Sequence, residues 1–367
     1  MKMVITGLRI AVGVLFIFSG LVKANDPMGL AYKIEEYFEG WKLFWMISYA
    51  KPLSIGMNAL EIISGFALLI GWQNKWNLRL LFTLILFFTA LTGYTYYTGY
   101  PKTCGCFGDC LPISSSTSFY KDLVLLVAIG FLMLKQSLFG RLLPERLSAA
   151  LMLLVALFSF GLEMYVLRHL PVVDCLPYRL GVNIPEGRKQ PPPPPGSTAM
   201  FVYRKNGQEI EFSADKFPDD FSAATYTFVR RYDTGEIPQA PIQGLVLYSQ
   251  SGTDTTESIL TSDHLLVIFT EEIGGLLDQG KQEWEAIYAL GSSMHVPIAL
   301  VTNRAEDWSP MMADKYPATV LLSCDRTPIR TAARVNPTLY ELKKGTVMGK
   351  WALADWGAAH KKILRVP

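Results

Sequence analysis

Five apolar runs of about 20 residues each constrain the fold of this 367-residue chain most strongly, and all of them lie in its first half. They cover approximately residues 3–22, 52–72, 77–98, 119–138 and 147–167. A helix rises 1.5 Å per residue, so about 20 apolar residues cross the roughly 30 Å of hydrocarbon in a bilayer. The pattern predicts five transmembrane helices, with a loop of roughly thirty residues between the first two.

Half of the residues are apolar and only 18% are charged, a composition expected of a chain that combines a membrane-spanning part with a soluble part. Proteins that bind nucleic acid neutralise its phosphates with clustered cations. Here 34 Lys and Arg nearly balance 32 Asp and Glu, for a net charge of +2. We therefore expect membrane lipid, and no nucleic acid, among the partners of the chain.

The charges beside the five runs predict an orientation in the membrane. Lys and Arg are equally frequent on both sides, but those on the amino-terminal side lie in the terminus and in very short loops, where the positive-inside rule is strongest. We expect a multi-pass inner-membrane protein with its amino terminus inside. The third loop and everything after residue 168 would then face the periplasm, where paired thiols are stable.

Three cysteines, Cys104, Cys106 and Cys110, lie within seven residues in the polar gap between the third and fourth runs. Glycines at 105 and 108 let the backbone bend, so Cys106 could pair with either Cys104 or Cys110. A shuttle from Cys175, on the same predicted side, is a third possibility.

This cluster allows three kinds of chemistry. Cys104 and Cys106 could be a redox pair, they could form a static disulfide that tightens the loop, or the three cysteines could hold a metal with another ligand. No histidine lies near in sequence to favour the metal. We take Cys104, Cys106 and Cys110 as the candidate catalytic residues.

Glu61 lies inside the second apolar run, where a carboxylate is unfavourable unless it is paired or faces a cavity. Its expected partner is Lys23 or a hydroxyl. The pair either fixes the first helix against the second or carries a proton or contacts a quinone.

The second half of the chain has the pattern of a soluble domain. Five consecutive prolines, residues 191–195, favour an extended spacer. Asn206-Gly207 between alternating apolar residues predicts a hairpin. Strands at residues 265–269, 297–301 and 318–322 alternate with helices at 283–294 and 308–314, which predicts a parallel sheet with crossover helices.

The end of the chain resembles the thioredoxin fold over roughly residues 262–364. Pro337 precedes a strand, a turn at Lys344-Gly345 leads into a strand at 346–351, and residues 356–364 would form the closing helix. The likeness fails where the chemistry would lie, because no Cys-x-x-Cys follows the first strand. It implies a partner-binding module without thiol chemistry of its own, in which Cys324 is a buried structural thiol.

Two motifs in the first half resemble the DoxX and MauE membrane families. Gly20-x-x-Lys23-x-x-Asp26-Pro27, together with Glu61, is similar to DoxX, and CGCFGD at residues 104–109 is similar to MauE. The layout resembles the Bacteroidota DoxX-like proteins that add a fifth helix and a periplasmic extension. Both families are associated with sulfur redox at a membrane, so the resemblance implies electron transfer from thiols, by analogy to a quinone.

Together these features predict a multidomain chain, an α-helical transmembrane bundle followed by an α/β thioredoxin-like domain. We expect a four-helix DoxX-like bundle over 1–140, a fifth helix over 141–170, a proline-rich linker over 171–199, a small β-containing segment over 200–261 and the thioredoxin-like domain over 262–367.

The corresponding functional expectation is a thiol/disulfide oxidoreductase that oxidises or matures periplasmic and envelope proteins with thiols. A quinone is the possible cofactor, with Glu61 and Lys23 as its contacts. The alternative is a non-catalytic membrane-anchored scaffold for envelope protein assembly.

Overall fold

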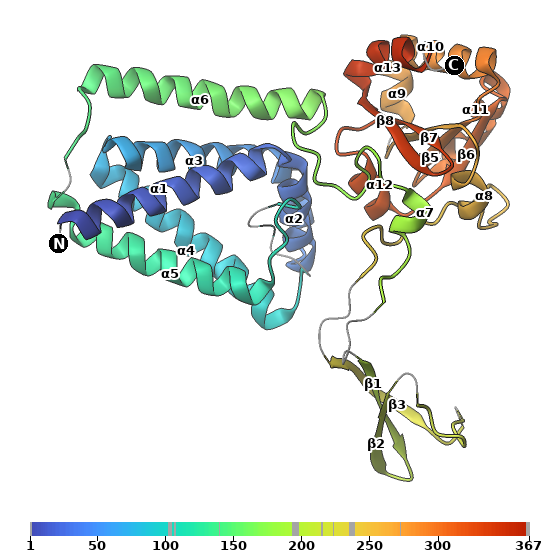
Figure 1. The fold of residues 1–367 in the computed structure, drawn as a ribbon, viewed down its shortest axis with the longest axis horizontal. Helices are drawn as coiled ribbons and strands as arrows, with labels where there is room; N and C mark the ends of the chain where they lie inside the picture. Colours follow the sequence, from blue (N-terminus) through green and yellow to red (C-terminus); the bar gives the residue numbers. More distant parts are fainter. Residues whose placement is uncertain are drawn as a thin grey trace.

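The computed structural model describes residues 2–101, 105, 108–138, 140–192, 198–213, 216–222, 224–234, 239–271 and 273–364. An amino-terminal helical region is followed by a sheet-rich carboxy-terminal domain (Figure 1). A small separate sheet lies between them in the sequence.

Five helices in the described residues are long and apolar enough to cross a membrane, which confirms the predicted number of spans. They are α1 (Lys2–Ala24), α3 (Ala50–Ile70), α4 (Asn74–Thr98), α5 (Ser115–Leu134) and α6 (Glu145–Arg168). Two short 3-10 turns, η1 (Phe44–Tyr49) and η2 (Gln136–Leu138), precede α3 and follow α5. Helices α1, α3, α4 and α5 pack together, whereas α6 lies along α3 at the side of this bundle (Figure 1).

Glycines bring α1 and α3 into close contact. A Cβ atom built on Gly65 would lie 2.7 Å from the carbonyl oxygen of Gly13, and one on Gly20 would lie 3.0 Å from the Ile62 amide nitrogen. Small residues allow two backbones to approach in this way, so that dispersion forces can hold helices together in lipid.

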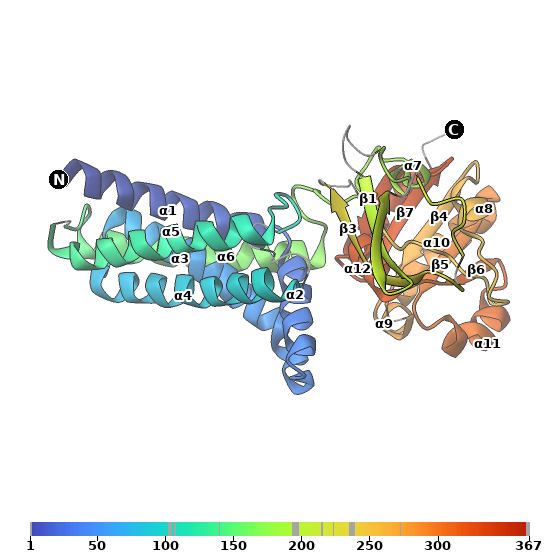
Figure 2. The same ribbon diagram turned by 90° about the horizontal axis from the view of Figure 1, so that it is seen from below.

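The segment between the first two spans, expected to be a loop, contains the helix α2 (Pro27–Gly40). The Asp26 side chain caps this helix by accepting a hydrogen bond from the Gly29 amide at 3.0 Å, and Pro27 occupies its first position. Asp-Pro is a signal for a helix start, so the loop expectation was wrong for a reason readable in the sequence. Helix α2 crosses the end of the bundle nearest the sheet-rich domain (Figure 2).

The sheet-rich domain has five strands in the order β6-β5-β4-β7-β8. They are β4 (Leu265–Phe269), β5 (Ile298–Thr302), β6 (Thr319–Ser323), β7 (Thr338–Lys343) and β8 (Thr346–Ala352). Strands β4, β5 and β6 are parallel, while β7 and β8 are antiparallel to their neighbours. All five residues of β4 are buried, because helices and loops cover both faces of this central strand.

The helices of this domain follow the predicted alternation closely. They are α7 (Ile184–Gly187), α8 (Thr256–Leu260), α9 (Ile273–Gln279), α10 (Lys281–Met294), α11 (Ala305–Lys315), α12 (Arg326–Ala332), η3 (Leu353–Asp355) and α13 (Trp356–Ile363). The sheet is mixed. The predicted alternation of strands and helices accounts only for its parallel half, β4 to β6. The peptide bond before Pro337 is cis.

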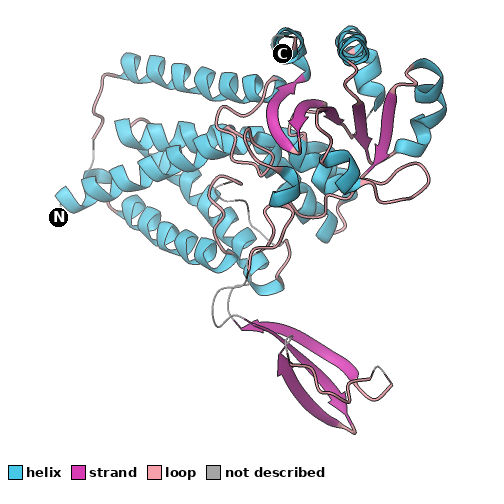
Figure 3. Ribbon diagram, turned by 45° about the vertical axis from the view of Figure 1, so that its right-hand side comes forward, coloured by secondary structure: helices cyan, strands magenta, loops and turns pink. Residues whose placement is uncertain are grey.

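A second sheet has the order β2-β1-β3, with β1 (Thr198–Lys205), β2 (Gln208–Ser213) and β3 (Thr227–Thr234). Asn206 and Gly207 form the predicted turn between β1 and β2, both with positive φ. This sheet projects away from the rest of the chain (Figure 3). Of the predicted proline spacer, residues 193–195 lie outside the described residues.

Candidate functional site

The described part of the cysteine loop is bent at its glycines. Gly105 and Gly108 have φ of 67° and 56°, a region that glycine occupies without strain, and the Gly108 amide donates to the Gly105 carbonyl at 3.0 Å. Cys104 and Cys106, the candidate redox pair, lie outside the described residues. Cys110 is described, and its partner is not one of the two.

Cys110 forms a disulfide with Cys175, with 4.9 Å between their Cα atoms. The predicted alternative that joins Cys106 to Cys110 is therefore wrong for this structure, because the Cys110 sulfur is already bonded. The two cysteines are 65 residues apart in sequence, so that α5 and α6 lie between them. Both are half-buried, which leaves the bridge within reach of solvent.

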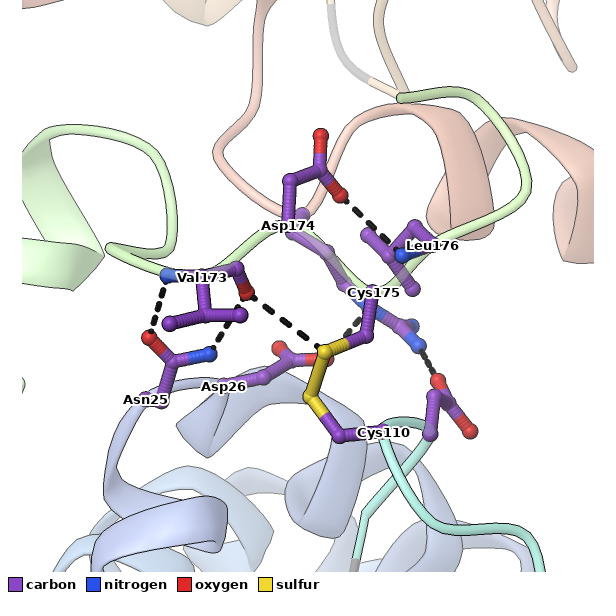
Figure 4. Close-up of a disulfide and its surroundings, with 9 residues drawn as sticks. Asn25, Asp26, Cys110, Val173, Asp174, Cys175 and Leu176 are labelled. Carbon is purple, nitrogen blue, oxygen red and sulfur yellow. Dashed lines mark hydrogen bonds and ion pairs between the residues drawn. A yellow bond between two sulfur atoms is a disulfide. The ribbon is translucent and has the colours of Figure 1, made fainter. Parts of the chain in front are cut away.

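Three consecutive residues after α6 bind three different parts of the chain, and Figure 4 shows the contacts of Val173 and Cys175. Val173 exchanges two hydrogen bonds with the Asn25 side chain, at 2.8 and 3.0 Å, next to the end of α1. Asp174 accepts a hydrogen bond from Lys350 of β8 at 2.8 Å, and Cys175 carries the disulfide to the cysteine loop. Segment 173–175 therefore connects the bundle, the loop and the sheet-rich domain at one place.

Arg334, just after α12, also connects these parts. Its Nε donates to Asp26 at 2.9 Å, and its Nη2 pairs with Asp109, the residue before Cys110. Burial raises the pKa of Asp26, although Arg334 opposes this shift. Burial lowers the pKa of Arg334, but the two carboxylates outweigh it and raise the pKa overall. Arg334 is therefore held charged between the bundle and the cysteine loop.

Arg330 makes a second ionic connection one turn earlier. It donates to Glu35 of α2 at 2.7 Å and to Glu271 at 3.0 Å, and its guanidinium lies 4.3 Å from the centre of the Tyr32 ring. The Glu271 amide in turn donates to the Asn336 side chain at 3.1 Å. The end of β4 and the loop before the cis-proline thus face the bundle.

A cleft of about 600 Å³ lies between the bundle and the sheet-rich domain. Glu36 and Glu39 of α2 line one wall, Arg326 and Thr327 of α12 line another, and Cys175 also lines it. Its volume is within the range of roughly 300 to 1,000 Å³ that is typical of ligand sites. The disulfide therefore borders a cleft that is large enough for a ligand and has charged side chains on two of its walls.

Within the bundle, Lys23 and Glu61 form the predicted ion pair, and both side chains are only 3% exposed. Beside them is a cavity of about 20 Å³, which Lys121 and Asp122 of α5 also line, 2.6 Å from one another. This volume accommodates one water, whereas an apolar cavity that binds benzene measures roughly 150 Å³. The predicted contact of Lys23 and Glu61 with a quinone is therefore not favoured by this geometry.

Cys324 is the buried structural thiol that the sequence predicts, at 4% exposure and without a disulfide. Burial raises its pKa to about 11, so it stays a neutral thiol under ordinary conditions. In the described part of the chain, no group of three or more His, Cys, Asp or Glu side chains is placed to hold a metal.

Several residues at these sites were not predicted. Arg330 and Arg334 carry no local signal, because their partners in the bundle are about 300 residues away in sequence. Glu163 did carry one. It is a carboxylate inside the fifth apolar run, where an ionisable residue is a candidate for function, and it proves to be fully buried.

Residues 1–135 match the family described as Methylamine utilisation protein MauE. This part of the chain is MauE-like. The match covers α1 to α5 with the cysteine loop, and omits α6 and everything after it. Residues 198–235, which include β1, β2 and β3, match a domain of unknown function, DUF8463. No curated protein and no solved structure matches the chain.

The comparison agrees with the five candidate spans in placing the chain among multi-pass membrane proteins. It confirms the expected resemblance to MauE. The likenesses to DoxX and to thioredoxin stay predictions.

Proposed function

We propose that this protein is an integral membrane thiol/disulfide oxidoreductase that acts on protein thiols beside the cysteine loop. The observation that carries the proposal is the half-buried disulfide between Cys110 and Cys175 at the edge of a large cleft. Two more cysteines, Cys104 and Cys106, precede Cys110 in the same loop. A disulfide near further thiols can accept electrons from a substrate and pass them on by exchange.

In the proposed reaction, a substrate thiolate attacks the sulfur of Cys175, which lines the cleft, and Cys110 leaves as a thiolate. A second substrate thiolate then attacks the mixed disulfide and releases Cys175. One disulfide breaks in this protein and one forms in the substrate, so the substrate loses two electrons. Its two protons end on Cys110 and Cys175.

The reduced pair of Cys110 and Cys175 then passes its electrons on. We propose that a disulfide between Cys104 and Cys106 accepts them by the same kind of exchange. A lipid-soluble quinone is the class of final acceptor that a membrane protein of this kind would use. The proposal routes no step through Lys23 and Glu61, because the cavity beside them is water-sized.

The sheet-rich domain would serve as a thioredoxin-like binding module. Its mixed sheet and the position of Pro337 directly before β7 support this assignment, and the described residues after β4 include no cysteine pair. We place this domain and the cysteine loop in the periplasm and the bundle in the inner membrane. The likeness of residues 1–135 to MauE supports a bundle that lies in a membrane.

The exchange can be tested with the full-length protein in detergent and one equivalent of a reduced dithiol peptide. We expect the peptide to be oxidised stoichiometrically while two alkylatable thiols appear among positions 104, 106, 110 and 175. Cys175→Ser should abolish this, and Cys324→Ala, at a buried thiol away from the cleft, should not. A peptide that stays reduced, with no new alkylatable thiol in the protein, would show that the bridge is static and would refute the proposal.

A scaffold without catalysis is the second candidate, and the ionic contacts of Arg330 and Arg334 favour it, because they dock the sheet-rich domain on the bundle without any need for exchange. In a scaffold, replacing both Cys110 and Cys175 by serine leaves partner maturation in cells intact. In an oxidoreductase, the same change stops it.

A further inference from the structure

Two buried polar side chains attach α6 to the bundle. The Asn58 Nδ2 of α3 donates to Glu163 Oε1 of α6 at 2.9 Å, and both residues are 0% exposed. Among the other buried residues of α6, Met152 and Val166 have apolar side chains, and the hydroxyls of Ser148 and Ser159 donate to carbonyls within or next to α6. The amide and the carboxyl group thus make a specific contact within the membrane-spanning part of the chain.

The other oxygen atoms of these two side chains lack hydrogen-bond donors among the described residues. Glu163 Oε2 and Asn58 Oδ1 are both buried and lack any hydrogen-bond partner in the described structure. An ionised carboxylate accepts hydrogen bonds but cannot donate one, and the same is true of an amide oxygen. Two acceptors therefore remain without a donor, at a depth where an unsatisfied polar group is costly.

The described residues offer no cation to Glu163. None of the ion pairs in the described residues involves this carboxyl group. Glu61, which lies on α3 one turn after Asn58, differs in this respect because it pairs with Lys23. A lone carboxylate charge in hydrocarbon is expensive, whereas a neutral carboxylic acid is not. A proton on Oε2 removes the charge and supplies the missing donor in a single step.

We propose that Glu163 and Asn58 form a proton-binding site inside the membrane. Glu163 is a neutral acid there, which accepts from Asn58 Nδ2 through Oε1 and donates from Oε2 to Asn58 Oδ1. This reciprocal acid and amide pair satisfies all the buried atoms. It goes beyond the proposed thiol chemistry, since it involves no sulfur and concerns the helix that the MauE match omits.

The site makes opposite predictions for two buried glutamates, Glu61 of α3 and Glu163 of α6. Glutamine at 163 keeps one acceptor and supplies a permanent donor, so Glu163→Gln should preserve the paired geometry without a bound proton. Glutamine at 61 removes the charge that Lys23 needs. We therefore expect Glu163→Gln to melt at or above the temperature of the wild type, and Glu61→Gln to melt clearly below it.

The protonation state can be measured directly by infrared spectroscopy of the full-length protein in detergent at neutral pH. We expect a carboxylic-acid C=O band that shifts in deuterium oxide, is absent in Glu163→Gln, and is kept in Glu61→Gln. Asn58→Leu should shift this band because the acid loses its partner. The infrared spectrum reports the protonation state of Glu163 even if a variant is too unstable for melting experiments.

Two results would overturn the site. A carboxylic-acid region unchanged by Glu163→Gln would mean that Glu163 is ionised. A rise in melting temperature with added NaCl, absent with equal choline chloride and lost in Glu163→Gln, would mean that a sodium ion satisfies the two acceptors in place of a proton. Neither outcome bears on the dithiol reaction of Cys110 and Cys175, so the two proposals fail independently.

Discussion

Individual residues in the bundle show how charge is tolerated inside a membrane. Lys23 and Glu61 come from different helices, and each is buried only because the other is present. Removing one partner of a buried ion pair leaves an uncompensated charge, which is far more costly than removing both. The pair therefore fixes the register of α1 against α3.

Mutation of this pair should be strongly non-additive. We expect Lys23→Met or Glu61→Leu alone to lower the free energy of unfolding by about 3–5 kcal/mol, and the double variant to lower it by less than either. Denaturant titration of the four proteins in one detergent measures the coupling. Additive losses would show that the two side chains are stabilised separately.

The buried thiol of Cys324 predicts a pH dependence. Its pKa is raised to about 11 by burial, against an ordinary value of about 8.5. Because the folded protein holds this proton more tightly than the unfolded chain, the stability from burial is complete below the ordinary pKa and is lost as pH rises towards 11.

Alkylation of native protein by iodoacetamide, followed at the Cys324 peptide by mass spectrometry, checks this shift. The rate should keep rising to about pH 11, whereas the same peptide in denaturant should level off near pH 8.5. A native rate that levels off at the denatured value would contradict the burial of this thiol.

At the scale of elements, the contact between α1 and α3 depends on the lack of a side chain at particular glycines. A Cβ at Gly65 meets backbone oxygen, which cannot move aside as a flexible side chain can. We expect Gly65→Ala to destabilise the bundle by about 1–3 kcal/mol. Thermal unfolding in detergent provides the measurement.

Gly56 is the matched control, because it lies on the same helix with nothing within 4 Å of its Cβ position. Alanine there should be neutral or stabilising by up to about 1 kcal/mol, through helix propensity. Equal losses at 56 and 65 would show that close helix contact is not the cause.

The elements also show what a sequence can reveal. The spans and the strand Leu265–Phe269 were predictable, because apolar run length and burial on both faces leave a direct trace in the residues. Helix α2 had a trace as well, in Asp26 and Pro27. For the bond between Cys110 and Cys175 the sequence indicates only that both cysteines lie on the same side of the membrane, since the pairing itself depends on where α5 and α6 return the chain.

At the scale of the whole molecule, one covalent bond and several ion pairs hold the sheet-rich domain on the bundle. Arg334 lies at the centre, with carboxylates from the bundle and from the cysteine loop on either side. Arg334→Ala leaves both carboxylates without their cation, so we expect weaker docking. Hydrogen exchange at α2 should rise in this variant and stay unchanged in Lys344→Ala, whose side chain is 79% exposed on the same domain.

Reducing the disulfide should make docking sensitive to salt. Ion pairs that solvent reaches, such as that of Arg334 with the 45%-exposed Asp109, weaken as ionic strength rises, because the Debye length falls from about 10 Å at 0.1 M to about 3 Å at 1 M. While the Cys110 to Cys175 bond is intact, it keeps the charged groups at high effective concentration. We therefore expect hydrogen exchange at α2 to rise between 0.1 and 1 M salt far more in Cys110→Ser/Cys175→Ser than in the oxidised wild type. Equal salt dependence in both would mean that the bridge contributes nothing to docking, and that apolar contacts hold the two parts together.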